Sequence, residues 1–427
     1  MEATLLLFGG LFLLLLLGVP IAVALGTMAL LAMWKYELGI FVCSANFYSG
    51  IAKYPLLAVP FFILAGMILE RSGVSARLVN LASLIVGGIP GGIAIVAVLV
   101  CVFFGGISGS GPADAAAIGA VLIPEMVRKG YSKAFAAAVI AAGGSTAIIV
   151  PPSIALILYG VITTTSIPAL FAGGAIPGFL AGMSLIIPAY LVSRKRGYVG
   201  ERRGSLREIG RAFREAFWGL LAPVVILGGI YGGIFTATEA AVVAVFYGLF
   251  VGMIVYRTLS LKDFYEILVQ ASLASAVVLL IVTLAGLYSW AGSTLGVMEK
   301  MASAILSISS SQITALILVN FLILIAGMFL DAISIYYVFL PILLPIVAHF
   351  NWDPLWFGIV MTLNLAIGQF TPPVAVNLYV TTNLASINLE ETSVAVIPFV
   401  LAMTIALILV ILFPSLSLML PKILNLY

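Results

Sequence analysis

Long apolar stretches dominate the sequence, and they constrain the fold more than any other feature. A helix that crosses the hydrocarbon core of a membrane needs roughly 20 mostly apolar residues. The candidate stretches occupy residues 3–17, 20–34, 54–70, 168–192, 217–235, 239–256, 264–290 and 396–420. Charged residues make up only 8% of the chain, against roughly 25% in soluble domains. Too few charges are present to cover a water-facing surface, so the sequence predicts an all-α polytopic membrane protein.

The first two stretches, at 3–17 and 20–34, are short for separate membrane spans. They could form two helices, or one long helix that bends at residues 18–20. No basic segment precedes the first apolar run and no small-residue cleavage site follows it. We therefore expect a retained membrane helix rather than a signal peptide.

Two halves of the chain repeat the same pattern. Several prolines and one glycine recur at a constant separation of 221 positions. The pairs are Pro124 with Pro345, Pro151 with Pro372, Pro152 with Pro373, Pro177 with Pro398, and Gly106 with Gly327. Such constancy indicates a duplicated unit of about 200 residues.

Each predicted repeat contains a re-entrant helical hairpin and a discontinuous helix. The first repeat is expected at 1–192, with its hairpin near 91–127 and its broken helix near 133–162. A basic linker follows at 193–215. The second repeat is expected at 216–427, with its hairpin near 312–347 and its broken helix near 354–382.

The distribution of basic residues predicts the orientation. The linker is the most basic segment, so the positive-inside rule places it in the cytoplasm. Threading outward from it leaves 15 of the 19 basic residues inside, and only Lys35, Lys53, Lys300 and Lys422 outside. Five spans in each half make the second repeat inverted relative to the first. The prediction is an inner-membrane protein with both termini in the periplasm.

Two segments of mixed polarity, 72–88 and 291–310, remain. They suit interfacial helices that connect a scaffold to a mobile part. Plain loops would explain the same composition.

The strongest local feature is the glycine-rich run at 105–112 (GGISGSGP). A helix break inside a membrane leaves backbone groups that must be satisfied, so it is tolerated where it lines a cavity or binds an ion. The hydroxyls of Ser108 and Ser110, the backbone at Gly106 and the freed carbonyls are hard oxygen ligands suited to a small cation. A tight hairpin turn without a ligand is the alternative.

A second break runs from Gly144 and Ser145 to the proline pair at Pro151. Two consecutive prolines stop a helix and free the carbonyls before them. Ser153 is placed to cap the half-helix that follows. The counterpart in the second repeat is the run at 368–373 (GQFTPP), which contains Gly368, Thr371 and Pro372 and has Asn377 one turn further on. A purely structural kink is the alternative for either break.

Asp331 lies in the second glycine-containing tip and aligns with Ser110 at the same separation of 221. An ionisable side chain within a membrane is a functional candidate, although Asp331 could also serve only as a helix cap. Asp114 is better explained as a charge that favours a helix N-terminus than as a direct ligand. Glu239 suits a helix start capped by Thr238, which is a structural role.

Other chemistries lack support in the sequence. Cys43 and Cys101 show no metal or redox spacing, and His349 has no second histidine with which to share a metal. The glycine-rich runs lack the lysine and hydroxyl residue of a nucleotide-binding loop. No catalytic constellation is present, so we expect neither an enzyme nor ATP-driven transport.

The breaks and tips together resemble one family. Five stretches, 108–119, 149–160, 232–241, 327–331 and 368–373, resemble the large membrane subunit, of the DctM/SiaM type, of tripartite ATP-independent periplasmic (TRAP) transporters. Ala237 departs from the family, in which proline is more common there. The resemblance implies sodium-driven uptake of an organic acid by an elevator-like motion. It also implies two partners, a small four-helix membrane subunit on a separate chain and a periplasmic substrate-binding protein.

This resemblance leads to a hypothesis for the site, with Na⁺ as the only metal. One sodium ion is expected between Gly106, Ser108 and Ser110 and the break from Gly144 and Ser145 to Pro151. A second is expected between Gly327 and Asp331 and the break at Gly368, Thr371 and Pro372. The substrate carboxylate is expected near Ser110, Ser153, Asp331, Thr371 and Asn377, where half-helix N-termini favour a negative charge.

Two alternative functions remain open from the sequence. A stand-alone sodium-coupled carboxylate or anion transporter would need no binding protein. A channel or scaffold subunit would not couple transport to sodium. Sialic acid and C4-dicarboxylates both suit the family as substrates, with sialic acid slightly favoured.

Overall fold

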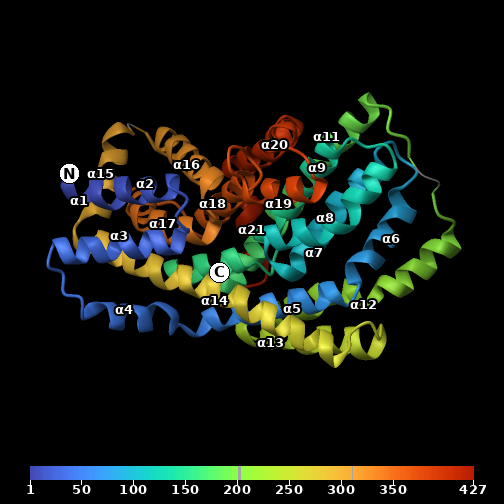
Figure 1. Ribbon diagram of the computed structural model, residues 1–427, viewed down its shortest axis with the longest axis horizontal. Coiled ribbons are helices and arrows are strands. Elements are labelled where there is room, and N and C mark those ends of the chain that lie inside the picture. The colour runs from blue at the N-terminus through green and yellow to red at the C-terminus, as the bar shows by residue number, and fades with distance from the viewer. Residues whose placement is uncertain (201–202, 310) are drawn as a thin grey trace.

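The computed structural model describes residues 1–200, 203–309 and 311–427, and the regular elements in these ranges are helices (Figure 1). Eight of the described helices are long and apolar enough to cross a membrane. Glu201 and Arg202 of the predicted linker, and Ser310 at the end of the second mixed segment, lie outside the described residues.

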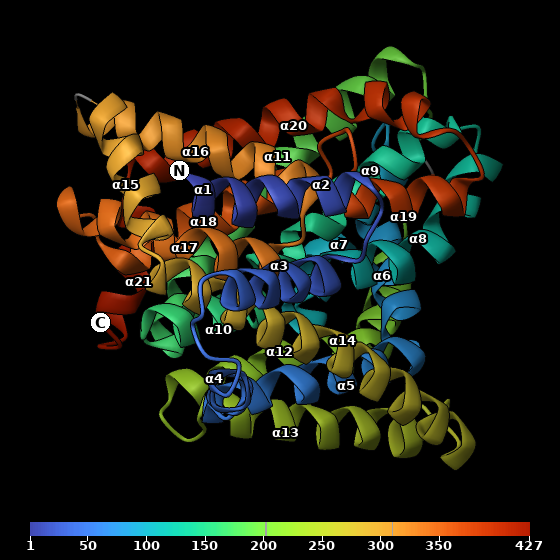
Figure 2. The same ribbon diagram turned by 60° about the vertical axis from the view of Figure 1, so that its left-hand side comes forward.

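The N-terminal apolar stretches form two helices rather than one bent helix. The first runs from Glu2 to Leu16 through α1 (Glu2–Thr4), a π-helical turn and α2 (Gly10–Leu16), and the second is α3 (Ile21–Lys35). Gly18 has a φ of +79°, which glycine adopts readily, and the chain reverses there. An ion pair of 3.1 Å between Lys35 Nζ and Glu2 Oε1 joins the far ends of the two helices. The helices therefore run antiparallel (Figure 2).

One layer of the molecule consists of long helices from both halves, which we call the scaffold helices. They are α1 to α3 with α4 (Val42–Ile51), α5 (Ala58–Arg71), α12 (Leu206–Tyr231), α13 (Ala237–Leu249) and α14 (Leu261–Thr294). Glycines allow close packing here, because a Cβ on Gly248 would lie 2.9 Å from Ile68 Cγ2. Figure 2 shows α4, α5, α12, α13 and α14 together along one side of the molecule.

The start of α13 corrects one prediction. Its N-cap is Thr236, not Thr238. Thr236 Oγ1 accepts a hydrogen bond from the Glu239 N–H at 3.3 Å, and Glu239 Oε2 accepts one from the Thr236 N–H at 2.8 Å. This reciprocal capping box requires the acid three residues after the cap, a spacing that Thr236 satisfies and Thr238 does not. The predicted structural role of Glu239 agrees with this geometry.

Most of the remaining helices form a second layer, which we call the hairpin bundle. Each repeat contributes a hairpin, a broken helix and a long closing helix in the same order. The first repeat supplies α7 (Gly92–Ser108), α8 (Gly111–Arg128), α9 (Lys133–Ser145), α10 (Ile154–Thr163) and α11 (Ile167–Lys195), and the second supplies α16 (Gln312–Phe329), α17 (Ala332–His349), α18 (Pro354–Gly368), α19 (Val376–Ala385) and α20 (Leu389–Leu412), followed by α21 (Ser415–Ile423). The predicted fold class, with two repeats of hairpin and broken helix, is confirmed.

The two mixed segments are largely helical rather than loops. They contain α6 (Val74–Val86) and α15 (Val297–Ile308), although α14 extends into the second segment as far as Thr294. Each follows a scaffold helix and precedes the first arm of a hairpin. Both begin after a glycine with positive φ, Gly73 and Gly296. The described part of the chain therefore passes from scaffold to hairpin bundle through a helix in each repeat.

The hairpin tips are packed directly on the helix breaks. A Cβ on Gly105 would lie 2.7 Å from Ala147 Cα, and one on Gly368 would lie 2.7 Å from Gly327 Cα. Only glycine permits such approaches between backbones. In each repeat the hairpin and the broken helix are thus one packed unit.

We predict that Gly105→Ala destabilises the protein by about 1–3 kcal/mol, because the added methyl group collides with backbone that cannot yield cheaply. Gly286→Ala is the matched control, since Gly286 lies inside α14 and an added methyl group there would have no described atom within 4 Å. We expect the control to be neutral or stabilising by up to about 1 kcal/mol. Thermal unfolding of the two purified variants in detergent measures the difference. Equal unfolding midpoints would contradict the tight packing of tip and break.

Candidate functional site

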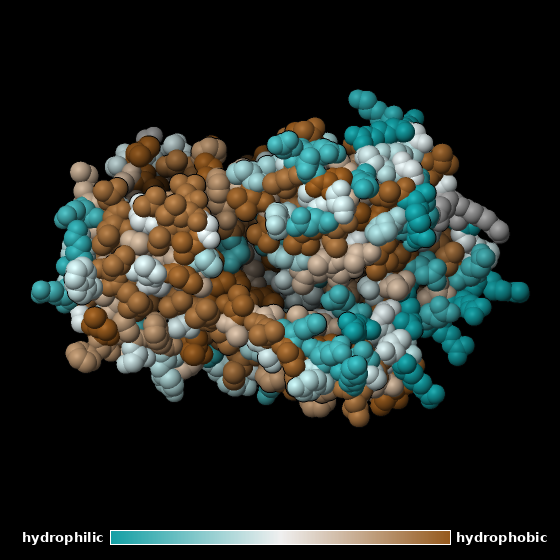
Figure 3. Space-filling model, viewed as in Figure 1, coloured by the Kyte–Doolittle hydropathy of each residue, from teal (hydrophilic) through white to brown (hydrophobic). Residues whose placement is uncertain are grey.

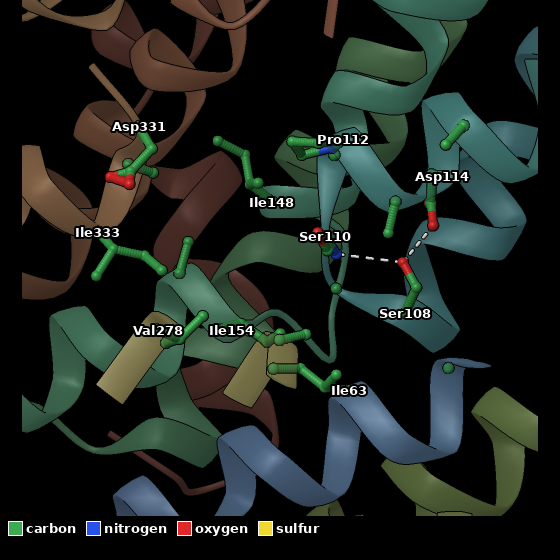
Figure 4. Close-up of a pocket in the computed structure, with 18 of the residues that line it drawn as sticks. Ile63, Ser108, Ser110, Pro112, Asp114, Ile148, Ile154, Val278, Asp331 and Ile333 are labelled. Carbon is green, nitrogen blue, oxygen red and sulfur yellow. Dashed lines mark hydrogen bonds between the residues drawn. The ribbon is translucent and has the colours of Figure 1, made fainter. Parts of the chain in front are cut away.

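A cavity of about 400 Å³ lies where the hairpin bundle meets the scaffold helices (Figure 4). Both hairpin tips line it, at 108–114 and 331–333, and both breaks reach it through Ile148, Ile154 and Gln369. The scaffold helices α5 and α14 close the other side. Residues far apart in the sequence therefore meet at one site, as the paired breaks predicted.

The first tip is organised by hydrogen bonds among its own side chains. Ser108 ends α7, Gly109 has a φ of +64°, and Ser110 is the N-cap residue of α8. The Ser110 N–H donates to Ser108 Oγ at 3.2 Å, and Ser108 Oγ in turn donates to Asp114 Oδ1. The Ser110 side chain does not cap the helix. Its hydroxyl therefore remains available to a ligand.

Asp114 lies in the first turn of α8, as the sequence predicted, but its surroundings go beyond a dipole interaction. The side chain is fully buried and lines the cavity. Its second oxygen, Oδ2, has no hydrogen-bond partner among the described residues. A buried carboxylate with a free oxygen is costly without a cation or proton nearby.

The second tip presents a carboxylate at its outer edge. Asp331 is the N-cap of α17, where Oδ1 accepts from the Ser334 N–H at 2.7 Å and Oδ2 accepts from the Ser334 hydroxyl at 3.2 Å. The same residue lines the cavity. The capping role and the position at the cavity, which the sequence left as alternatives, are therefore both present in one residue.

The first break brings the predicted cation ligands of the first repeat together. A Cβ on Gly106 would lie 3.2 Å from the Pro151 carbonyl oxygen, and one on Gly144 would lie 3.1 Å from the Gly111 carbonyl oxygen. Ser145 is fully buried, and its hydroxyl donates to the Ala142 carbonyl at 2.7 Å. This hydroxyl is thus already used within its own helix.

Ser153 acts as the predicted cap of α10. Its Oγ accepts from the Leu156 N–H at 3.3 Å and donates to the Ile148 carbonyl oxygen. The side chain is buried, and the neighbouring Ile154 rather than Ser153 reaches the cavity. Ser153 therefore shapes the start of the half-helix beneath the cavity.

The second break places Gly327 against Gly368, as described above. The Thr371 hydroxyl donates to the Ile367 carbonyl at 2.6 Å, and the Ala375 N–H donates to the Met328 carbonyl at 3.0 Å. Pro372 and Pro373 follow Thr371, as the matching pair does in the first repeat. Thr371 is not among the residues that line the cavity.

Asn377 joins the two repeats. Its Nδ2 donates to the Ala141 carbonyl of the first repeat at 3.3 Å, and its Oδ1 is buried with no partner among the described residues. A Cβ on Gly111 would lie 3.0 Å from Asn377 Nδ2. Asn377 thus lies beneath the first tip rather than in the wall of the cavity.

Two polar side chains of the cavity wall were not selected from the sequence. Gln369 lies inside the GQFTPP run, and its buried Oε1 has no partner among the described residues. Glu70 ends an apolar stretch, where an acid is usually a solvated helix end, yet it lines the cavity from α5. His349 is an exposed residue at the end of α17, and it lies outside the cavity wall.

The charges of the cavity are unusual for a site that would receive an anion. Three carboxylates, Glu70, Asp114 and Asp331, line it, whereas the described lining residues include no lysine, arginine or histidine. Three helices, α8, α10 and α17, begin at lining residues. Their N-terminal N–H groups can interact with a negative group. The arrangement suits an anion accompanied by cations.

The fold defines a polytopic helical membrane protein of the two-hairpin type. The chain is similar to the YdaH transporter of Alcanivorax borkumensis, with a TM-score of 0.61 and 14% identity over 97% of this chain and 98% of that chain. It is also similar to MtrF of Neisseria gonorrhoeae, with a TM-score of 0.58 and 14% identity over 88% and 83% of the two chains. At this level of identity, the likeness establishes the fold alone.

Sequence comparison identifies the family. Residues 8–416 match the DctM component of the tripartite ATP-independent periplasmic transporters, and the chain belongs to this family. It is 37% identical to the C4-dicarboxylate TRAP transporter large permease protein DctM of Rhodobacter capsulatus, over 99% of this chain and 100% of that protein. It is also 37% identical to the sialic acid TRAP transporter large permease protein SiaM of Vibrio cholerae, over 95% of each chain.

A third relative is longer than this chain. The isethionate TRAP transporter permease protein DctMQ of Oleidesulfovibrio alaskensis is 42% identical over 94% of this chain. The match spans 64% of the length of that protein.

We predict that Ser108→Ala lowers the stability of the protein by about 1–3 kcal/mol, because it removes the hydrogen-bond donor to the buried Asp114 carboxylate. Ser110→Ala is the matched control, since its side chain is not the cap of α8, and we expect no measurable change in stability. Thermal unfolding in sodium-free buffer measures both effects. A larger loss in Ser110→Ala than in Ser108→Ala would contradict the geometry of the first tip.

Proposed function

We propose that the chain is the transport subunit of a sodium-coupled secondary transporter that imports an organic acid. It would work in the bacterial inner membrane with a small four-helix membrane subunit on a separate chain. A periplasmic substrate-binding protein would deliver the acid. Membership of the TRAP family supports this assembly.

The charge of the cavity is the observation that carries the proposal. An organic acid would be repelled on entering a cavity with three carboxylates and no basic residue among its described lining residues. Cations bound first would reduce this repulsion and order the tips around the anion. Binding of the acid would then depend on sodium, which is the coupling that a symporter requires.

We place the two sodium ions where each tip meets its break. Gly106, Ser108 and Ser110 would supply oxygens opposite the segment from Gly144 to Pro151. Gly327 and Asp331 would do so opposite Gly368, Thr371 and Pro372. The close approach of the Gly106 backbone to the Pro151 carbonyl supports the first position.

The acid would lie between the two tips, with its carboxylate toward the N-termini of α8 and α17. Ser110 and Asp331 line this space, and Ser153, Thr371 and Asn377 would act through the backbone that they hold. The relatives are named for C4-dicarboxylates, sialic acid and isethionate. We therefore propose an organic acid as the substrate.

The orientation follows from charge. Hydrophilic residues gather at the end of the molecule where α11 ends and α12 begins (Figure 3). The basic linker connects these two helices and therefore lies at the same end of the molecule. We propose that this end faces the cytoplasm and that both termini face the periplasm. Labelling of single cysteines at the termini by a membrane-impermeant reagent in intact spheroplasts tests this orientation. Labelling only after lysis would contradict it.

Two alternative functions give different results in reconstitution. A stand-alone sodium-coupled transporter would take up the acid without a binding protein. A channel would show conductance without a sodium requirement. Uptake that requires both sodium and the binding protein supports the proposal against both alternatives.

We propose that transport proceeds by an elevator motion, in which the hairpin bundle moves against the scaffold helices. The bundle is internally packed through glycine contacts, and the cavity lies between its tips and the scaffold helices α5 and α14, which also contact the bundle directly. Lys53 Nζ donates to the Val161 carbonyl at 3.3 Å and thereby links scaffold and bundle. A single hydrogen bond of this kind can break without great cost.

We predict that Asp331→Asn lowers sodium-driven uptake about tenfold or more, since an interaction with a charged group contributes about 1.5–3 kcal/mol. Asparagine keeps the helix cap, so folding should be preserved. Asp353→Asn is the matched control, because Asp353 caps α18 in the same way but does not line the cavity. Uptake into proteoliposomes with an imposed sodium gradient measures both variants. Equal uptake would contradict a role for the Asp331 charge.

We predict that the Gly66→Val variant distinguishes a mobile hairpin bundle from one that is fixed to the scaffold helices. A Cβ on this scaffold glycine would lie 3.1 Å from Ser108 Cα in the first tip, so a larger side chain excludes the observed arrangement. If the bundle moves, it can settle in another position, and uptake should fall about tenfold while the unfolding midpoint changes little. If the bundle is fixed, the midpoint should fall as in Gly105→Ala, by about 1–3 kcal/mol. That second result would contradict the elevator motion.

A further inference from the structure

We propose that the cavity selects a compact acid with one anionic group and an apolar body, in preference to dicarboxylates and polyhydroxylated acids. This inference rests on the proposed function and narrows its substrate class. The cavity of about 400 Å³ is large enough to enclose a small acid. Its wall, rather than its size, carries the argument.

Branched aliphatic side chains surround the cavity from several directions. Ile63 approaches from α5, Val278 from α14, Ile148 and Ile154 from the first break, and Ile333 from α17 (Figure 4). Scaffold and hairpin bundle thus both present alkyl groups to the substrate. An alkyl body would be removed from water against these side chains, whereas a hydroxylated body would lose its hydration there.

The cavity offers few partners for substrate hydroxyl groups. Among its uncharged polar side chains, Ser108 already donates to Asp114, which leaves the Ser110 hydroxyl and the Gln369 amide. The remaining acceptors are the carboxylates of Asp331, which already accepts from the Ser334 N–H and hydroxyl, and of Asp114 and Glu70. Hydroxyls of a polyhydroxylated acid that face the aliphatic wall instead of these groups would lose their partners in water, and each unpaired group weakens binding.

The charge of the cavity opposes a second anionic group. The helix N-termini at α8 and α17 can receive one carboxylate between the two tips. A second carboxylate at the other end of the substrate would face the aliphatic wall or Glu70, which lines the cavity from α5. No basic residue in the described part of the chain lines the cavity to receive it. One anionic head is therefore the arrangement that the cavity satisfies.

The test uses the purified full-length chain together with its small subunit, so that selectivity of the binding protein does not enter. Thermal stabilisation is titrated with 3-methyl-2-oxobutanoate, succinate and gluconate, in sodium chloride and in choline chloride. We expect the branched monoanion to reach half-maximal stabilisation at a concentration about tenfold or more below the other two, and only in sodium. Stabilisation by succinate or gluconate at equal or lower concentration would overturn the inference.

The two buffers separate this inference from the proposed function. If the branched acid is preferred equally in sodium chloride and in choline chloride, that result would contradict sodium coupling and support the inference. Sodium-dependent stabilisation that favours succinate or gluconate would leave the proposed function standing and overturn the inference. No response to any acid in sodium would contradict both.

Val278→Thr tests the aliphatic wall directly, because it replaces a methyl group by a hydroxyl of similar size. We expect the affinity for 3-methyl-2-oxobutanoate to fall about tenfold, and its advantage over gluconate to shrink accordingly. Val277→Thr is the matched control on the same helix, since Val277 is 58% exposed and does not line the cavity. An equal effect of the two substitutions would overturn the role of the wall in selectivity.

Discussion

The structure depends on satisfying the backbone at two helix breaks within apolar surroundings. Each proline pair ends a helix and frees carbonyl groups that cannot reach water at low cost. The hairpin tips cover the breaks by packing backbone against backbone, with Gly106 beside Pro151 and Gly327 beside Gly368. Within the first break, the Ser153 hydroxyl donates to the Ile148 carbonyl. In the second repeat, a hydrogen bond of 3.0 Å from the Ala375 N–H to the Met328 carbonyl fixes the contact.

This packing also determines where the polar chemistry of the molecule can lie. Breaks and tips are the only parts of the described hairpin bundle where several polar groups converge on the cavity, because the helix interiors are committed to their own hydrogen bonds. The converging groups are acidic, with Asp114 bonded by Ser108 and Asp331 bonded by Ser334. A site with this charge gains an affinity for anions only through cations, so the backbone architecture and the proposed sodium coupling share one physical origin.

The repeats could be predicted from the sequence because the residues that define them act on nearby backbone. Proline pairs, glycine runs and a serine cap at Ser153 act within a few residues, and their constant separation reveals the duplication. The features that the sequence did not predict depend on contacts between residues that are far apart in the chain. The reversal between α2 and α3 brings together Glu2 and Lys35, which are 33 positions apart. Glu70 and Gln369 reach the cavity only because helices from separate repeats meet there, and the cap of α13 depended on choosing between two nearby threonines.

The two repeats share a backbone plan but not its chemistry. Asp331 aligns with Ser110 and Asp114 aligns with Ile335, so each tip carries one carboxylate, at a different position. The carboxylate of the first tip is fully buried and held by a hydroxyl, whereas that of the second tip caps a helix at the edge of the cavity. A cation at the first tip would therefore be more enclosed than one at the second. This asymmetry would place the more accessible charge beside the proposed substrate position, where it could respond to the arrival of the anion.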